Sequence, residues 1–261
     1  AGGGSIPFES MRCGIDSVAL EYNPAAYILL KATLEYPKTY GPQLAEDVER
    51  WGREVLRRAQ EEIGHLYPKH AGGEPSHYIW CWVAECQRCH QKNPLVSQWW
   101  LVRKNRKRLG LRPILHNKDF DVAFTKEPPD GTVIDAESTC LGCSAPVTNE
   151  HIRREISSGK RRLMCVVVPD KGGKAYEKPS SDDLEALDQA EKLLQERWEE
   201  FEKLNLIPVE EMPKYELNRV VPYGFDRWCS LFSSRQLLAL LTLSKHIVAV
   251  IKEVDSQKGR Q

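Results

Sequence analysis

The sequence has no net charge and no hydrophobic run of membrane-spanning length. Its 261 residues carry 37 lysines and arginines against 37 aspartates and glutamates, so the formal net charge is zero. A balanced chain exerts no global field on a polyanion, and any binding of nucleic acid has to come from local basic patches. A membrane helix needs about 20 consecutive apolar residues, and no run approaches that length. We therefore expect no association with a membrane.

The beginning of the sequence lacks the basic segment and apolar core of a secretory signal peptide. We therefore expect a cytoplasmic protein, in which paired cysteines indicate metal binding before disulfides. Four of the eight cysteines form two Cys-x-x-Cys pairs, Cys86 with Cys89 and Cys140 with Cys143. Because zinc prefers four soft ligands in a tetrahedron, these four residues are the predicted zinc ligands. A redox dithiol and disulfides are the alternatives, and His90 is expected to be exposed rather than a ligand.

The chain opens with a glycine-rich stretch, AGGGSIPFE, and an acid follows about twenty residues later. Gly2, Gly3 and Gly4 allow the backbone to approach a ligand closely. Residues 18–20 are predicted to form a short buried strand that ends at Glu21. A carboxylate there can accept hydrogen bonds from ribose hydroxyls, as in nucleotide-type cofactor sites at the carboxyl ends of parallel strands. A flexible terminal tail is the alternative interpretation.

Several motifs resemble those of adenine-specific DNA methylases that carry an inserted zinc-ribbon domain. The matching segments are the opening stretch, LEYNP at 20–24, WG at 51–52, IGHLYP at 63–68, YIW at 78–80, YGFDRW at 223–228, LF at 231–232 and RQLLAL at 235–240. The resemblance covers most of the chain and implies S-adenosylmethionine as cofactor. It places the three glycines in the cofactor loop and Glu21 at the ribose-binding acid. We assign Asn23, in the turn that follows, to the same site.

The catalytic motif of this family is missing. Amino-group methyltransferases carry Asp, Asn or Ser, then Pro-Pro, then an aromatic residue that stacks on the flipped base. The only Pro-Pro, at 128–129, is followed by Asp130 and Gly131, which is typical of a turn. No buried strand precedes the glycine loop either. We therefore expect an internal fragment that has no catalytic residues, is inactive alone, and has the remainder of the methyltransferase as a partner.

The expected fold class is α/β. It comprises a partial Rossmann-like methyltransferase fold, an inserted zinc-ribbon β domain and flanking helices. The cofactor-binding segment spans 1–72, the zinc ribbon 73–178, and a helical segment that returns to the methyltransferase core 179–261. A break is predicted at 34–37, and a long amphipathic helix at 43–66.

Within the last segment, a helix is predicted from residue 180 or 181 to 204, a linker at 206–220, and an apolar helix after 233. Ser180 or Ser181 is expected to cap the first of these helices, and Ser233 with Gln236 has the form of a capping box. Arg227 and Arg235 are interpreted as surface residues, with phosphate contact as the alternative.

The predicted zinc ribbon contains a small antiparallel sheet. Its strands are expected at 95–102, at 109–115 with an interruption at Pro113, and at 121–124. A basic run lies between the first two of them, at a hairpin tip beside Trp99 and Trp100. Its residues can grip phosphates: Arg103, Lys104, Arg106, Lys107 and Arg108.

Three functions are compatible with these features. The first is an S-adenosylmethionine-dependent DNA methyltransferase acting on the amino group of adenine, of which this chain is the cofactor-binding and zinc-ribbon portion. The alternative is a non-catalytic zinc-ribbon module or subunit that binds nucleic acid. A structural scaffold that binds neither cofactor nor DNA is the third.

Overall fold

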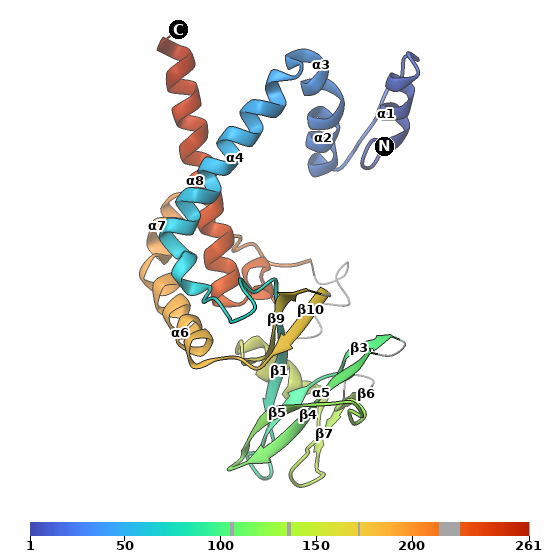
Figure 1. Cartoon of the computed structure of the whole chain (residues 1–261), viewed down its shortest axis with the longest axis vertical. Helices are drawn as coiled ribbons and strands as arrows, with labels where there is room; N and C mark the ends of the chain where they lie inside the picture. Colours follow the sequence, from blue (N-terminus) through green and yellow to red (C-terminus); the bar gives the residue numbers. More distant parts are fainter. Residues whose placement is uncertain (105–106, 135–136, 172, 214–224, 261) are drawn as a thin grey trace. The chain divides into compact units, whose positions relative to one another are not determined.

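The computed structural model describes residues 1–104, 107–134, 137–171, 173–213 and 225–260 (Figure 1). Helices and strands both occur, which confirms the mixed α/β class. The chain forms two compact units, one of Ala1–Gln60 with His246–Gln261 and one of Glu61–Lys245. The three-domain division at residues 72 and 178 stays a prediction.

The first unit is helical. Its elements are α1 (Ser5–Arg12), α2 (Pro24–Leu30), the π-helical η1 (Lys31–Glu35), α3 (Tyr36–Tyr40), most of α4 (Gln43–Ile63) and the C-terminal part of α8 (Ser234–Arg260). The break predicted at 34–37 is instead a continuous turn of π-helix leading into α3. Pro37 lies in the first turn of α3. A proline ring clashes with the preceding helical turn and offers no N–H, and a widened turn accommodates both effects.

The predicted strand at 18–20 is wrong. These residues are extended, and no described strand pairs with them. Val18 is 90% exposed and Leu20 is 82% exposed, so the segment is not buried either. A strand is stabilised by hydrogen bonds to a neighbour and by burial of a face, and the described residues supply neither. Among residues 1–40, only Gly4, Pro7 and Leu30 are buried.

The second unit contains three antiparallel sheets. The largest has the order β10-β9-β1-β2 and consists of β1 (His77–Glu85), β2 (Lys92–Leu95), β9 (Arg161–Asp170) and β10 (Gly173–Glu177) (Figure 1). The second consists of β3 (Trp100–Lys104), β4 (Lys107–His116) and β5 (Asp119–Thr125), and the third of β6 (Val133–Ile134), β7 (Glu137–Thr139) and β8 (Pro146–Val147). A Rossmann sheet is parallel, whereas every strand pair between described residues is antiparallel. The partial Rossmann-like fold stays a prediction.

The strand predicted at 95–102 is divided between β2 and β3. The chain near Gly131 packs on the intervening residues so closely that a Cβ atom there would lie 2.1 Å from the carbonyl oxygen of Ser97. The Thr132 amide donates to the Val96 carbonyl at 2.8 Å, which removes residue 96 from a regular ladder. Pro113 does not interrupt β4, because it pairs with Val122 of β5 at a position beyond the reach of β3.

Helices make up the rest of the regular structure described in this unit. They are the short η2 (Gly64–Leu66), α5 (Asn149–Ser157), α6 (Ser181–Glu196), α7 (Trp198–Lys203), η4 (Trp228–Leu231) and the first part of α8. Leu66, Phe201 and Leu238 are fully buried in their common core. The single helix predicted to reach 204 is interrupted at Arg197, whose guanidinium pairs with Glu62 and Glu200.

The predicted cap at Ser180 and the predicted capping box of Ser233 with Gln236 are confirmed, and the structure adds that Ser180 forms a capping box with Asp183. Part of the predicted linker, residues 214–220, lies outside the described residues, as do 223 and 224 of the YGFDRW motif. Within the described part of the chain, no helix has the length and apolarity that crossing a membrane requires.

Candidate functional site

The four predicted metal ligands lie in two turns of the second unit. Cys86 and Cys89 belong to the turn between β1 and β2, and Cys140 and Cys143 to the turn between β7 and β8. The ligand atoms of all four lie within 4.8 Å of one another. The structure therefore brings together two segments that are distant in sequence.

The two turns have the same backbone hydrogen bonds. In the first, the Cys86 amide donates to the Gln91 carbonyl and the His90 amide donates to the Cys86 carbonyl, both at 2.9 Å. The second turn repeats both bonds at the same offsets, beginning at Cys140. The residue after each second cysteine has a positive φ, 62° at His90 and 56° at Ser144. This repetition indicates two copies of one ligand-presenting turn.

The spacing of the sulfur atoms fits a metal ion. Cys86 Sγ lies 3.7 Å from Cys143 Sγ, and Cys89 Sγ lies 3.6 Å from Cys140 Sγ. A tetrahedral site with metal–sulfur bonds of about 2.3 Å separates its sulfurs by about 3.8 Å. A disulfide needs about 2.05 Å, and all four cysteines are free. The donor set is thus suited to a metal such as zinc.

Surrounding groups stabilise negative charge on one sulfur in particular. Cys140 Sγ accepts from the Gly142 amide at 3.3 Å and from Asn93 Nδ2 at 3.6 Å. Burial raises the pKa of the Cys140 thiol, but the amides of Cys143 and Gly142 outweigh burial and lower that pKa to about 7. At Cys89, the Gln91 amide lowers the pKa, yet burial and the neighbouring thiols together raise it to about 12. Part of the cluster therefore offers a thiolate near neutral pH.

The role of Asn93 in the cysteine cluster was not predicted from the sequence. Asn93 is fully buried, and its Oδ1 accepts from the Leu141 amide at 2.8 Å, so it joins the first turn to the second. No local pattern marks this role, because it depends on a contact between segments 48 positions apart. His90 is exposed and hydrogen-bonds Glu85 through Nδ1 at 2.9 Å, which agrees with its predicted exclusion from the ligand set.

The opening glycines and the predicted ribose-binding acid lie together in the first unit. Glu21 Oε2 accepts from the Gly2 amide at 2.7 Å and from the Ala1 ammonium at 3.1 Å. Its Oε1 accepts from the amides of Tyr22 and Asn23 at 2.9 and 3.0 Å. The Asn23 amide, then the terminal ammonium and the Gly2 amide, lower the pKa of Glu21 to about 2. Four donors therefore engage this carboxylate.

The remaining predicted cofactor residues have different surroundings. Gly2 and Gly3 are exposed, whereas Gly4 is buried with a φ of 83°. A Cβ atom at Gly4 would lie 2.6 Å from Leu30 Cδ2, so close packing requires glycine there. Asn23 caps α2 by accepting from the Ala25 amide at 2.9 Å. These contacts are structural, and binding of S-adenosylmethionine stays a prediction.

The basic run lies at the tip of the β3–β4 hairpin, as the sequence predicts. Arg103 pairs across the strands with Arg108, and Lys104 with Lys107. The Trp100 ring lies near both arginines, whose guanidinium carbons are 5.6 Å (Arg103) and 5.1 Å (Arg108) from its centroid. Trp99 is buried in the core, and Arg106 lies outside the described residues.

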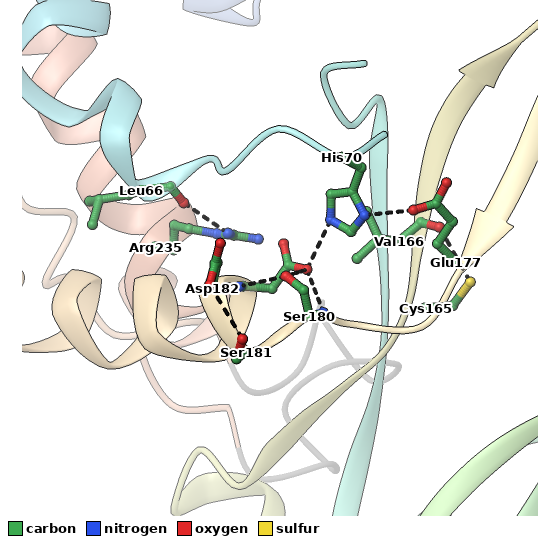
Figure 2. A network of polar contacts seen from close by, with 10 residues as sticks. Leu66, His70, Cys165, Val166, Glu177, Ser180, Ser181, Asp182 and Arg235 are labelled. Carbon is green, nitrogen blue, oxygen red and sulfur yellow. Dashed lines mark hydrogen bonds and ion pairs between the residues drawn. The ribbon is translucent and has the colours of Figure 1, made fainter. Parts of the chain in front are cut away.

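A histidine between two carboxylates forms a second polar cluster that the sequence did not indicate (Figure 2). His70 Nδ1 lies 2.8 Å from Glu177 Oε2, and His70 Nε2 lies 2.9 Å from Asp183 Oδ2. The His70 side chain is 6% exposed and that of Asp183 is fully buried. Burial lowers the pKa of His70, but the two carboxylates outweigh it and raise the pKa above its usual value. The residues that follow His70 in the sequence are Ala71, Gly72 and Gly73, and nothing in this local pattern indicates its role.

No protein-family model, curated protein or solved structure matches this chain. The resemblance to adenine-specific DNA methylases therefore depends on the sequence motifs alone.

The cluster predicts about one bound divalent metal ion per chain, as expected for a four-cysteine site. Cys86→Ser should lower the metal content of the purified protein to a small fraction, measured by elemental analysis. Cys13→Ser, which removes an exposed cysteine outside the cluster, should leave the content unchanged. Full occupancy in Cys86→Ser would contradict the assignment.

The His70 cluster predicts a stability that declines as the pH rises. Because the carboxylates raise the pKa of His70, its contribution is complete below the unfolded value of about 6.5 and is lost as the pH rises through the folded value. His70→Gln should cost about 1–3 kcal/mol in acid solution, where the charged hydrogen bonds exist, and less in alkaline solution. Denaturant unfolding at several pH values measures both. If His70→Gln lowers the free energy of unfolding by the same amount at every pH, His70 does not interact with Glu177 and Asp183 in its protonated form.

Proposed function

We propose that this chain is the cofactor-binding and zinc-ribbon portion of an S-adenosylmethionine-dependent DNA methyltransferase that acts on the amino group of adenine. The observation that carries the proposal is the 2.7 Å hydrogen bond between the Gly2 amide and Glu21 Oε2. The two parts that the family resemblance assigns to one cofactor site, the glycine loop and the acid, are thereby neighbours. The proposal extends to zinc as the metal, since four thiolates in a tetrahedron favour it.

Glu21 suits the role of a ribose acceptor in charge but is already engaged. Its pKa of about 2 keeps it ionised at neutral pH. Two carboxylate oxygens offer about four acceptor sites, and four donors already contact them. A ribose hydroxyl has to replace at least one of these donors.

The methyl donor supplies an activated methyl group on a sulfonium, so the protein mainly has to position the two reactants. This chain contributes the backbone of Gly2 to Gly4, the Glu21 carboxylate and the metal-stabilised turns. The Pro-Pro-aromatic motif that would hold the target adenine is not found in this sequence. We therefore assign catalysis to the remainder of the methyltransferase.

The exposed apolar residues of the first unit support such a partner. Val18, Leu20 and Tyr22 are 90, 82 and 102% exposed. They follow one another along an extended segment without a paired strand. Contiguous apolar surface of this kind is typical of an interface. We propose that the rest of the methyltransferase covers it and supplies the strand neighbour that the described residues lack.

The second candidate is a zinc-ribbon module that binds nucleic acid without catalysis. The arrangement of Trp100 with Arg103 and Arg108 favours it, because an aromatic ring beside two cations suits both base stacking and phosphate contact. The two candidates share the metal site and the hairpin. They differ in whether the first unit binds the methyl donor.

Titration calorimetry with S-adenosylmethionine tests the first candidate. The chain should bind the cofactor, and Glu21→Ala should weaken binding about tenfold or more, because hydrogen bonds to a carboxylate are strong. Glu9→Ala, which removes an exposed carboxylate paired with Arg12, should leave the affinity unchanged. If the unaltered chain and both variants bind S-adenosylmethionine with equal affinity, Glu21 is not part of the site. If the chain binds DNA but not S-adenosylmethionine, the second candidate is favoured.

Charge reversal at the hairpin tests DNA binding. Arg103→Glu combined with Arg108→Glu should weaken binding to a DNA duplex and reduce the slope of log affinity against log salt by about 2. Fluorescence anisotropy at two or more salt concentrations measures both quantities. Arg153→Glu with Arg154→Glu, on the exposed face of α5, is the matched change of charge. An equal loss in both variants would mean that the effect comes from net charge rather than from the hairpin.

A further inference from the structure

A cavity of about 560 Å³ lies within the second unit, apart from the metal cluster and the opening glycines. Residues at the beginning of β9, along α6 and at the beginning of α8 line it. Its volume falls within the range of about 300–1,000 Å³ that is typical of small-molecule sites. Neither the sequence motifs nor the proposed function assigns a ligand to it.

Two arginines of the cavity wall form no ion pair with a described carboxylate. Arg161 donates through one terminal nitrogen to the Ser230 carbonyl at 3.0 Å, and its Nε is buried without a hydrogen-bond partner. Burial also lowers the pKa of Arg161. Arg235 is 4% exposed and donates to the Leu66 carbonyl at 3.0 Å. In the part of the chain that the structure describes, neither guanidinium has an ion-pair partner.

Aromatic rings surround these guanidinium groups. Arg161 lies 4.0 Å from the centroid of Trp82, and Arg235 lies 4.0 Å from that of Tyr78 and 4.8 Å from that of Tyr67. Cation–π contact offsets part of the desolvation but does not cancel the charge. Because an unpaired buried charge is costly, an anion in the cavity would stabilise both residues. This is a correction to the prediction that Arg235 lies at the surface.

The third arginine of the wall offers a contrast. Arg162 pairs with Asp119 at 2.6 Å, and Asp119 also pairs with Lys92 at 3.1 Å. Arg162 therefore already has an ion-pair partner, which it shares with Lys92. Arg161 and Arg235 lie on different elements, both line the cavity, and form no ion pair with a described carboxylate.

The rest of the cavity wall contains aromatic residues and acidic residues. Trp80, Phe225 and Phe232 give it aromatic surface, suited to a flat ring. Asp188 and Glu191 of α6 are exposed carboxylates three residues apart that can accept from hydroxyl or amino groups. Cationic, aromatic and acidic groups thus share one cavity.

We propose that this cavity binds a nucleoside monophosphate. The phosphate lies against Arg161 and Arg235, where it neutralises both charges. The base packs on the aromatic wall, and the ribose hydroxyls donate to Asp188 or Glu191. The proposal does not depend on the methyltransferase assignment, since no residue of the cofactor or metal site takes part.

Calorimetry with uridine 5′-monophosphate tests the proposal on the full chain. This probe shares no base with S-adenosylmethionine, so it discriminates against the site at Glu21. We expect binding, about tenfold or greater weakening in Arg161→Gln, and loss of binding when uridine replaces the monophosphate. Arg153→Gln is the matched control. It removes an exposed arginine of α5 that does not line the cavity, so it should change the affinity less than threefold.

A second variant covers the case in which Arg161→Gln fails to fold. Asp188→Asn alters an exposed side chain. It should weaken the binding of the monophosphate several-fold and leave the binding of inorganic phosphate unchanged. Unchanged affinity in both Arg161→Gln and Asp188→Asn would overturn the proposal, as would failure of the monophosphate to bind. Binding of a single-stranded DNA oligonucleotide without binding of the monophosphate would also overturn it and assign the arginines to backbone phosphates. Glu21→Ala should leave the binding of uridine 5′-monophosphate unchanged. The cavity proposal and the proposed cofactor site at Glu21 can therefore fail independently of each other.

Discussion

The convergence of four sulfur atoms is the constraint on which the second unit depends. It connects positions 51 and 57 residues apart in sequence. The strands β6, β7 and β8 contain only two or three residues each, too few to be stable by pairing alone. A metal ion bound by all four thiolates would fix the turns that position these strands. Where a site of this kind is structural, the free energy of metal binding contributes directly to folding.

The net charge of this protein is zero, but its charged side chains are not all paired with one another. On α4, Arg50 pairs with Asp47 and Arg53 with Glu49, both one turn apart and exposed, which matches the solvated face expected of an amphipathic helix. Such pairs add little stability. Among the described residues, Arg103 and Arg108 of the β3–β4 hairpin and Arg161 and Arg235 of the cavity form no ion pair. A net charge of zero is therefore compatible with the two proposed sites for anions.

The sequence predicted the features that depend on a few neighbouring residues and missed those that depend on contacts between distant segments. The cluster of four cysteines was predicted because a Cys-x-x-Cys turn contains two candidate ligands and its own backbone donors within a few residues. The hairpin and the helix cap at Ser180 were predicted for the same reason. The segment at 18–20 was misread, because its apolar residues match a buried strand in composition while the described chain offers no neighbour. Arg235 was misplaced since α8 is apolar on nearly all sides, so its sequence does not show which face is buried. His70 and Asn93 depend entirely on contacts between distant segments.

Asn93 illustrates how one position can protect a site over time. Its side chain donates to the Gln91 carbonyl at 2.7 Å and to the Cys140 sulfur at 3.6 Å. Asparagine ages by deamidation when the nitrogen of the next peptide group attacks the side-chain amide, and the product would place a carboxylate beside a thiolate. The next residue is Pro94, whose nitrogen carries no hydrogen and is a poor nucleophile for this reaction. The Asn-Pro dipeptide thus shields the sulfur environment from the commonest spontaneous damage to asparagine.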